Sequence, residues 1–158
     1  DGLVLDQSIS KNIVMTILDN HLSALGLLDD EGMHKKVLEY IEALQIKIAS
    51  PSSAVKTLSG GNQQRVVLAK WIATNPALFI LDNPTVGIDV AAKSSIHSII
   101  KALAESGMAV LIISDEIAEV LYNCNRVLVM NRGRIIGEFD SAATTENDIQ
   151  TFIDFHAR

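Results

Sequence analysis

The sequence predicts an α/β fold, in which strands and helices alternate along the chain. Apolar runs at 78–81 and 109–113 have the length of strands, and each is continuous, as in a parallel strand buried on both faces. Between them, residues 91–105 carry apolar side chains at helical spacing, including Ile96, Ile99 and Ile100. Strand, helix and strand in this order favour a layered α/β structure.

The first half of the chain predicts helices. Ser8 or Ser10 can cap a first helix that runs to Leu18, and Gly26 and residues 29–30 interrupt the pattern. Residues 49–57 contain a proline and three serines and predict a loop. A second helix is predicted at 32–45, with one apolar face made of Val37, Leu38, Ile41 and Leu44.

The last third of the chain predicts a short helix, a hairpin and a final helix. The helix covers 116–122, and two strands at 126–130 and 134–139 are joined by the turn 131–133. A polar stretch at 140–146 leads to a helix that ends near His156.

Composition limits the class of protein. At 158 residues with 48% hydrophobic side chains, the chain can bury a core. The formal net charge of −6 and the absence of a basic cluster argue against a nucleic-acid surface. Cys124 is the single cysteine, so no internal disulfide or cysteine zinc cluster is expected. No apolar run approaches the roughly 20 residues of a membrane span, and no signal peptide opens the chain.

The stretch 58–65, Leu-Ser-Gly-Gly-Asn-Gln-Gln-Arg, precedes a helical run at 66–73. Ser59 stands at a helix start, and the amides of Gly60, Gly61 and Asn62 are expected to be free donors in the first turn. Such a helix end can bind a phosphate or another anion. The alternative is an ordinary serine N-cap followed by flexible glycines.

This stretch resembles the signature motif of ATP-binding-cassette (ABC) ATPases, and its form is similar to that of the sugar-importer branch, in which one polypeptide carries two cassettes. Residues 81–85, Leu-Asp-Asn-Pro-Thr, resemble the end of the Walker B strand, and 86–93 resemble the D-loop of the second cassette. Residues 112–116 fall where the switch strand ends. The resemblance implies a helical subdomain at 1–75 that ends in the signature helix, and part of the nucleotide-binding core at 76–158.

The resemblance assigns roles to three residues near the ends of the predicted parallel strands. Asp82 is expected to order magnesium-bound water beside the phosphates of ATP; the alternative is a strand-end Asp that caps a turn. Asn83 stands where active cassettes usually have Glu, and an amide cannot accept a proton. Asp115 replaces the usual switch His and brings negative charge toward a triphosphate. The ATP site that uses these residues is therefore expected to be catalytically weak.

ABC cassettes pair head to tail, so the signature motif of one faces the Walker motifs of the other. By this resemblance Ser59 donates to the γ-phosphate held by a partner cassette, beside Gly60 and Gly61, with Gln63 as a further contact. That composite site can be fully active. Asp89 is expected to link the two sites across the dimer, and it can also cap the helix 91–105.

The phosphate-binding loop Gly-x-x-x-x-Gly-Lys-Ser/Thr does not occur in this sequence, since none of its nine glycines is followed by lysine. In the family that loop lies upstream, and its strand separates the switch strand from the strand resembled by 126–130. The resemblance thus predicts a partial P-loop NTPase fold with an incomplete, mainly parallel sheet that lacks the Walker A strand. Open edges pair with other chains, so the isolated chain is expected to self-associate. Because the phosphate loop is absent, the isolated chain is not expected to hydrolyse ATP.

The resemblance predicts part of the ATP-binding subunit of a bacterial sugar importer. Its partners would be a second cassette, integral membrane permease subunits and, indirectly, a sugar-binding protein. Residues 7–28 resemble the surface that contacts the membrane subunit, and the alternative is an ordinary amphipathic helix. ATP and Mg²⁺ would be its ligands, and it would lie peripherally on the cytoplasmic face of the inner membrane. Two alternatives are a soluble non-transport ABC ATPase and a non-catalytic interaction or regulatory domain derived from a cassette. The Asn-Gln-Gln tail and the net charge of −6 count against the former, whereas Asn83 and Asp115 favour the latter.

Overall fold

The computed structural model describes residues 2–22 and 26–156. The chain forms two compact units, one with residues 1–77 and 87–99 and the other with residues 78–86 and 100–158. Helix α4 (Val90–Glu105) contributes residues to both units. The predicted subdomain boundary between residues 75 and 76 stays a prediction.

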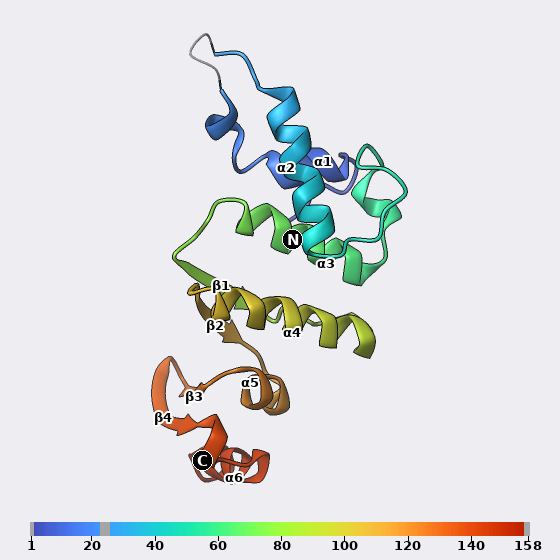
Figure 1. Cartoon of the computed structure of the whole chain (residues 1–158). Coiled ribbons are helices and arrows are strands. Elements are labelled where there is room, and N and C mark those ends of the chain that lie inside the picture. The colour runs from blue at the N-terminus through green and yellow to red at the C-terminus, as the bar shows by residue number, and fades with distance from the viewer. Residues whose placement is uncertain (1, 23–25, 157–158) are drawn as a thin grey trace. The chain divides into compact units, whose positions relative to one another are not determined.

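The first unit is built from helices (Figure 1). Helix α1 packs against both α2 and α3. The core of this unit consists of side chains that are almost completely buried, among them Ile9, Ile13, Val37, Val55 and Val66. Before α4, its elements are α1 (Ile9–Val14), the 3-10 helix η1 (Leu18–His21), α2 (Asp30–Ala43), the 3-10 helix η2 (Val55–Thr57) and α3 (Gly60–Ile72).

Side chains at the helix starts explain where α1 and α2 begin. The Ser8 Oγ accepts a hydrogen bond from the Lys11 amide at 3.1 Å, so Ser8 is the cap of α1. Asp29 accepts from the Gly32 amide at 2.9 Å, and α2 therefore begins at Asp30, ahead of the predicted start at 32. Helix α1 ends at Val14, well before the predicted end at Leu18.

One predicted helix face needs correction. Leu38 on α2 is 45% exposed, and the buried residues of that helix are Met33 and Val37. Leu38 lies directly beside the buried Val37 in the sequence, and a step of one residue turns a helix by about 100°. On α4, Ile96 and Ile100 are buried and Ile99 is half-buried, in agreement with the predicted apolar face.

The second unit contains two separate pairs of strands. Strands β1 (Leu78–Asp82) and β2 (Ala109–Ile113) are parallel, with Ile80 opposite Leu111 and Asp82 opposite Ile113. Among the described residues, these strands form a two-stranded sheet of their own, and β3 pairs with β4 alone. The predicted incomplete sheet is thus interrupted between β2 and β3.

The sequences of the two parallel strands predicted burial on both faces, and this prediction is wrong. Phe79 and Leu81 are buried, but Ile80 is 55% exposed and Ile113 is 48% exposed. Successive strand residues point to opposite faces, so one face of this small sheet is packed and the other carries exposed apolar side chains.

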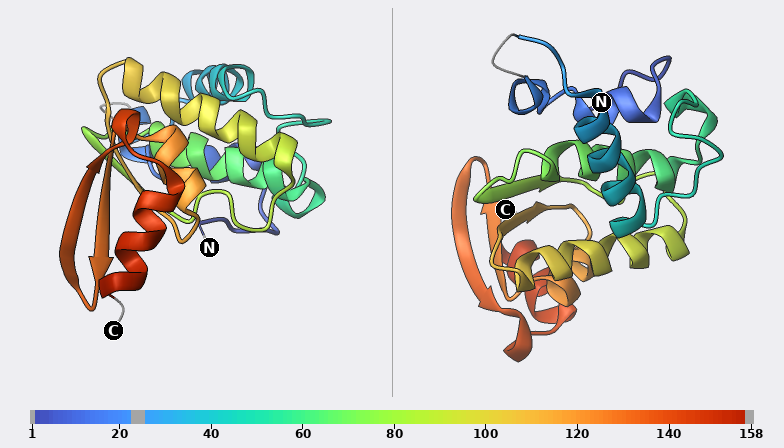
Figure 2. Two further views of the ribbon diagram at one scale, coloured as in Figure 1. Left: turned by 90° about the horizontal axis from the view of Figure 1, so that it is seen from below. Right: turned by 45° about the horizontal axis from the view of Figure 1, so that its top comes forward.

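The hairpin and the last helices form a second packed layer in this unit. Strands β3 (Arg126–Asn131) and β4 (Arg134–Asp140) are antiparallel and are joined by Arg132 and Gly133, both with positive φ. Helix α6 (Glu146–His156) lies along the hairpin in the left view of Figure 2. The core of this layer is Leu121 from α5 (Ile117–Asn123) with Val127, Val129 and Ile149. A further 3-10 helix, η3 (Ser141–Ala143), joins β4 to α6.

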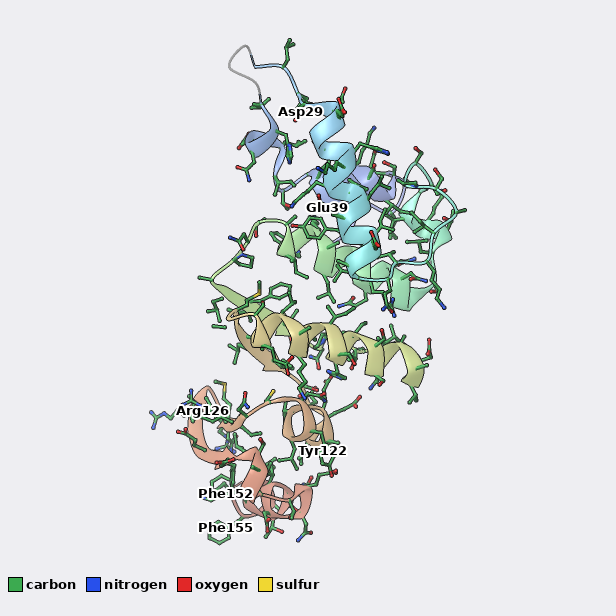
Figure 3. All side chains as sticks on the ribbon, in the orientation of Figure 1. Asp29, Glu39, Tyr122, Arg126, Phe152 and Phe155 are labelled. Carbon is green, nitrogen blue, oxygen red and sulfur yellow. The ribbon has the colours of Figure 1, made fainter. Side chains whose placement is uncertain are left out.

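Aromatic packing holds α6 on the hairpin. Phe152 and Phe155 both project from α6 (Figure 3). The Phe152 ring meets Phe139 edge to face, with ring centroids 5.2 Å apart. A Cβ at Gly137 would lie 2.6 Å from the Phe152 ring, so the glycine in β4 leaves the space that this ring occupies.

Candidate functional site

The start of helix α3 carries the predicted signature residues. Ser59 has extended backbone angles (φ −62°, ψ 156°), and its hydroxyl oxygen accepts no hydrogen bond from a backbone amide of the helix. Its carbonyl accepts the Gln63 amide at 2.9 Å. Within the described residues, the backbone amides of Gly60, Gly61 and Asn62 donate no hydrogen bond. The structure therefore contradicts an ordinary side-chain cap at Ser59 and leaves these first-turn donors open, as an anion site requires.

Asn62 holds the Ser59 hydroxyl, and sequence reasoning did not identify this side chain. The Asn62 Oδ1 accepts from the Lys47 amide at 3.0 Å, and the Asn62 Nδ2 donates to the Ser59 Oγ at 3.1 Å. Asn62 is half-buried, whereas Ser59 is exposed. The sequence does contain a signal for this contact: an asparagine stands three residues after the serine, and residues three apart lie on the same face of a helix.

The two glycines of the motif differ in their surroundings. Gly60 is exposed, and a Cβ there would lie 3.7 Å from the Ile88 side chain, an ordinary contact. Gly61 is buried, and a Cβ there would lie 2.8 Å from the Cβ of Ala92. Gly61 thus allows α3 and the first turn of α4 to approach closely, in addition to its predicted role.

Gln63 points back into its own chain. Its Nε2 donates to the Leu58 carbonyl at 3.0 Å, on the N-terminal side of the helix start. The side chain can contact a ligand through its oxygen without breaking that bond. Its predicted ligand contact stays a prediction.

Arg65 is a second residue that sequence reasoning left without a role. Its guanidinium donates to the carbonyls of Leu44 and Gln45, where α2 ends, and to the Ser95 Oγ on α4 at 2.6 Å. A cation at a helix C-terminus also interacts favourably with the exposed carbonyl dipoles. Arg65 therefore fastens α3 to the end of α2 and to α4.

Asp89 caps α4, which is one of the two roles expected for it. Its Oδ1 accepts from the Ala92 amide at 2.9 Å, and its carbonyl accepts from the Lys93 amide at 2.9 Å. This capping is compatible with a second contact to a partner. The predicted link across a dimer stays a prediction.

Asp82, Asn83 and Asp115 come from the carboxyl ends of the parallel strands β1 and β2. The register places Asp82 opposite Ile113, and Asp115 follows two residues later, so all three belong to one edge of this sheet. Asn83 has φ +47°, a left-handed conformation that Asn adopts more readily than most residues. Its amide N–H donates to the Ile113 carbonyl at 2.8 Å, and its Nδ2 donates to the Asp82 Oδ1 at 3.0 Å.

A magnesium ion bound by protein ligands alone is not supported at this edge. The described ranges contain no group of three or more His, Cys, Asp or Glu side chains placed to hold a metal. Asp82 is exposed and supplies a single carboxylate, with one oxygen already accepting from Asn83. Such a donor fits Mg²⁺ that keeps most of its waters and is held mainly by phosphates.

A buried polar pair ties this edge to helix α5. Thr85 is 1% exposed and Glu119 is 7% exposed. The Thr85 hydroxyl donates to the Glu119 carboxylate. Thr85 lies in the loop after β1, shortly after Asn83. Glu119 lies on α5, the helix after β2, shortly after Asp115. The bond between them therefore fixes this loop against α5.

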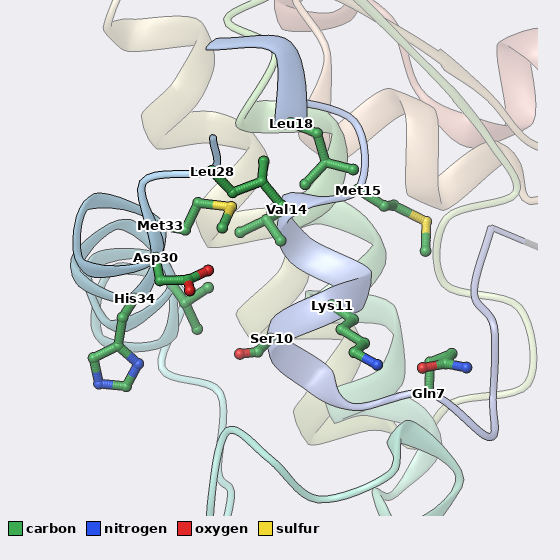
Figure 4. Close-up of a pocket in the computed structure, with 11 residues that line it drawn as sticks. Gln7, Ser10, Lys11, Val14, Met15, Leu18, Leu28, Asp30, Met33 and His34 are labelled. Atoms are coloured by element: carbon green, nitrogen blue, oxygen red, sulfur yellow. The ribbon is translucent and has the colours of Figure 1, made fainter. Parts of the chain in front are cut away.

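An apolar cavity of about 530 Å³ lies between α1 and α2 in the first unit (Figure 4). Val14, Leu18, Leu28 and Met33 gather around it, and Lys11, Asp30 and His34 also line it. Most of these residues fall within or beside the stretch 7–28, whose predicted contact with a permease stays a prediction. An apolar hollow with a few polar groups at its margin is typical of a binding site.

The family model described as ABC transporter matches residues 3–86. The chain belongs to the ABC transporter family. The resemblance inferred from the signature and Walker B motifs is therefore confirmed.

The chain is similar to ATP-binding proteins that are named for sugar import. It is 46% identical over 148 residues to a ribose import ATP-binding protein of Streptomyces avermitilis, covering 94% of this chain and 29% of that protein. It is 43% identical over 135 residues to a xylose import ATP-binding protein of Escherichia coli, covering 85% of this chain and 26% of that protein. The chain thus spans under a third of the length of these relatives.

Solved structures support the fold. A dimeric bacterial ABC transporter cassette superimposes with a TM-score of 0.75 at 24% identity, covering 88% of this chain and 59% of that one. The ADP conformation of an ATP-binding cassette of an ABC transporter gives a TM-score of 0.75 at 21% identity, covering 98% of this chain and 61% of that one. The predicted partial cassette fold is confirmed. None of the described helices is both long enough and apolar enough to cross a membrane.

Proposed function

We propose that this chain is part of the ATP-binding subunit of a sugar importer, and that its signature helix completes an ATP site whose phosphate-binding residues belong to a partner cassette. The import proteins of ribose and xylose among its relatives support the transport class. The observation that carries the proposal is the start of α3, where an exposed serine and three amides without acceptors adjoin one another.

The chemistry at this helix start follows from its donors. The Ser59 hydroxyl donates to a terminal phosphate oxygen, and the amides of Gly60 and Gly61 face the same charge at the positive end of α3. These groups hold the γ-phosphoryl group in line for attack by water. Positioning and charge stabilisation of this kind supply most of the catalysis in phosphoryl transfer.

The second site, at the ends of β1 and β2, contributes binding more than hydrolysis. Asp82 would hold a magnesium-bound water there, and Mg²⁺ when bound neutralises phosphate charge. Asn83 cannot act as a general base, and Asp115 places a further negative charge toward the nucleotide. Asp89, beside the signature helix in the chain's first unit, is proposed to connect the two sites across the paired cassettes.

The cavity between α1 and α2 is proposed to receive a segment of a membrane permease subunit, which would hold the protein on the cytoplasmic face of the inner membrane. Leu28→Glu puts a charge into this cavity and is expected to weaken copurification with the membrane subunits. Leu38→Glu on α2 is the matched control, because Leu28 is 48% and Leu38 45% exposed but only Leu28 lines the cavity. Equal losses for both variants would contradict the assignment.

Uptake by the reconstituted transporter tests the proposed function. Full-length protein with its membrane subunits in liposomes should import labelled ribose or xylose when the sugar-binding protein and ATP are supplied. Ser59→Arg should abolish import because the arginine side chain occupies the space of the γ-phosphate. ATP-driven import that survives Ser59→Arg, or the absence of import for every pentose and hexose tried, would contradict the proposal.

A further inference from the structure

We infer that Asn62 is a positioning residue, which orients the Ser59 hydroxyl so that its proton is directed outward to a phosphate. This inference rests on the proposed function of Ser59. It concerns the side chain of Asn62, in contrast to the backbone amides of the helix start.

The Lys47 amide determines which way the Asn62 side chain faces. A backbone N–H can only donate, so the atom at 3.0 Å from the Lys47 nitrogen must be the Asn62 oxygen. The Asn62 Nδ2 then faces the Ser59 Oγ, 3.1 Å away. The orientation of the amide is therefore set by a backbone group on the segment between α2 and η2.

This orientation decides what Ser59 can do. A hydroxyl has one proton and two lone pairs, and an amide NH₂ is a donor only. The Asn62 Nδ2 consequently occupies a lone pair of the Ser59 Oγ, and the hydroxyl proton points elsewhere. Because Ser59 is exposed and makes no capping bond to α3, that proton is available to an incoming acceptor.

An acceptor at the same place would reverse this arrangement. In Asn62→Asp one carboxylate oxygen can still accept from the Lys47 amide, but the other would accept the Ser59 proton. An acidic residue in the first turn stabilises a helix. Asn62→Asp therefore keeps the structural contacts of the residue and removes the orientation of the Ser59 proton, while its charge also repels a phosphate. The double-mutant cycle with Ala variants separates the orientation of the hydroxyl from this charge effect.

A double-mutant cycle on the full-length protein with its membrane subunits tests the inference. ATPase kcat, the KM for ATP and Tm are measured for Ser59→Ala, Asn62→Ala and the double variant. Removing the Ser59 donor should lower kcat by roughly tenfold or more. Asn62→Ala should lower kcat several-fold in the wild-type background and have no further effect when Ser59 is already Ala.

The outcomes are distinguishable. Equal losses from Asn62→Ala in both backgrounds would overturn the positioning role while leaving the role of Ser59 intact. A wild-type kcat for Ser59→Ala would instead overturn the proposed function, and the positioning role with it. Asn62→Asp should keep or raise Tm and lose turnover in the wild-type background, and wild-type turnover in that variant would also contradict the inference.

Discussion

Gly61 on α3 lies against Ala92 on α4 so closely that a Cβ added at the glycine would stand 2.8 Å from the alanine Cβ. Real Cβ atoms do not approach one another to this distance. The second glycine of the signature is therefore needed for helix packing, whatever its contact with a nucleotide. Ser59 and the open amides are held in place by that packing together with Arg65.

The contact predicts different costs for two neighbouring substitutions. Gly61→Ala should destabilise the chain by about 1–3 kcal/mol, because two packed helix turns must move apart. Gly60→Ala is the matched control and should stay within about 0.5 kcal/mol, since its new Cβ would meet nothing closer than 3.7 Å. Urea unfolding of each variant measures both values.

A compensating change separates this contact from a general effect on the helix. Ala92→Gly removes the opposing Cβ and should recover part of the loss caused by Gly61→Ala, although glycine in a helix itself costs about 1 kcal/mol. Strictly additive losses in the double variant would show that the two residues are not in contact.

Cys124 should react slowly with thiol reagents. Burial, and then the nearby Glu119 carboxylate, raise the pKa of the Cys124 thiol above its usual value. At pH 8 the fraction of reactive thiolate is thus smaller than in a free cysteine peptide, and the rate should keep rising with pH beyond the point where the peptide levels off.

Rates of alkylation by iodoacetamide between pH 7 and pH 10 check this prediction. Glu119→Gln removes the carboxylate charge while retaining an oxygen that can accept from Thr85, and it should increase the rate at pH 8. If the folded protein and the free cysteine peptide gave the same pH profile, the raised pKa of Cys124 would be contradicted.

Self-association of the isolated chain is expected from the open sheet. The exposed face of β1 and β2 carries Ile80, Leu111 and Ile113, and in the part of the chain that the structure describes neither β2 nor β3 has a second partner strand. Leu111→Lys should therefore lower the apparent mass in light scattering across a concentration series.

Leu38→Lys is the control for that experiment. Leu38 is 45% and Leu111 is 43% exposed, but Leu38 lies on α2 and not on the sheet. Equal effects of the two variants would indicate general solubility. A wild-type chain that stays monomeric at high concentration would contradict the prediction itself.

Much of the fold could be predicted because local patterns and packing agree. Strand lengths, turn residues and helical spacing located β1, β2, α4 and the hairpin. Burial was harder: the apolar residues of β1 predict coverage on both faces, yet Ile80 is exposed. A run of apolar residues shows that both faces can be covered, and only the neighbouring elements decide whether they are.

The candidate site was predicted less completely. The motif indicated Ser59, Asp82 and Asp89 at once, because their positions near helix and strand ends follow from the sequence. Asn62 and Arg65 act through carbonyls and amides of segments at 44–47, far away along the chain. No local pattern predicts such partners, since they depend on how α2 and α3 pack.

ATP hydrolysis by the full-length protein with its membrane subunits tests the division into a weak and an active site most directly. Steady-state rates are compared for wild type, Asn83→Gln and Ser59→Arg. Asn83→Gln removes no general base and should reduce turnover little, whereas Ser59→Arg should abolish most of it by displacing the γ-phosphate, a loss worth several kcal/mol of barrier reduction. Equal damage from the two substitutions, or greater damage from Asn83→Gln, would contradict this division.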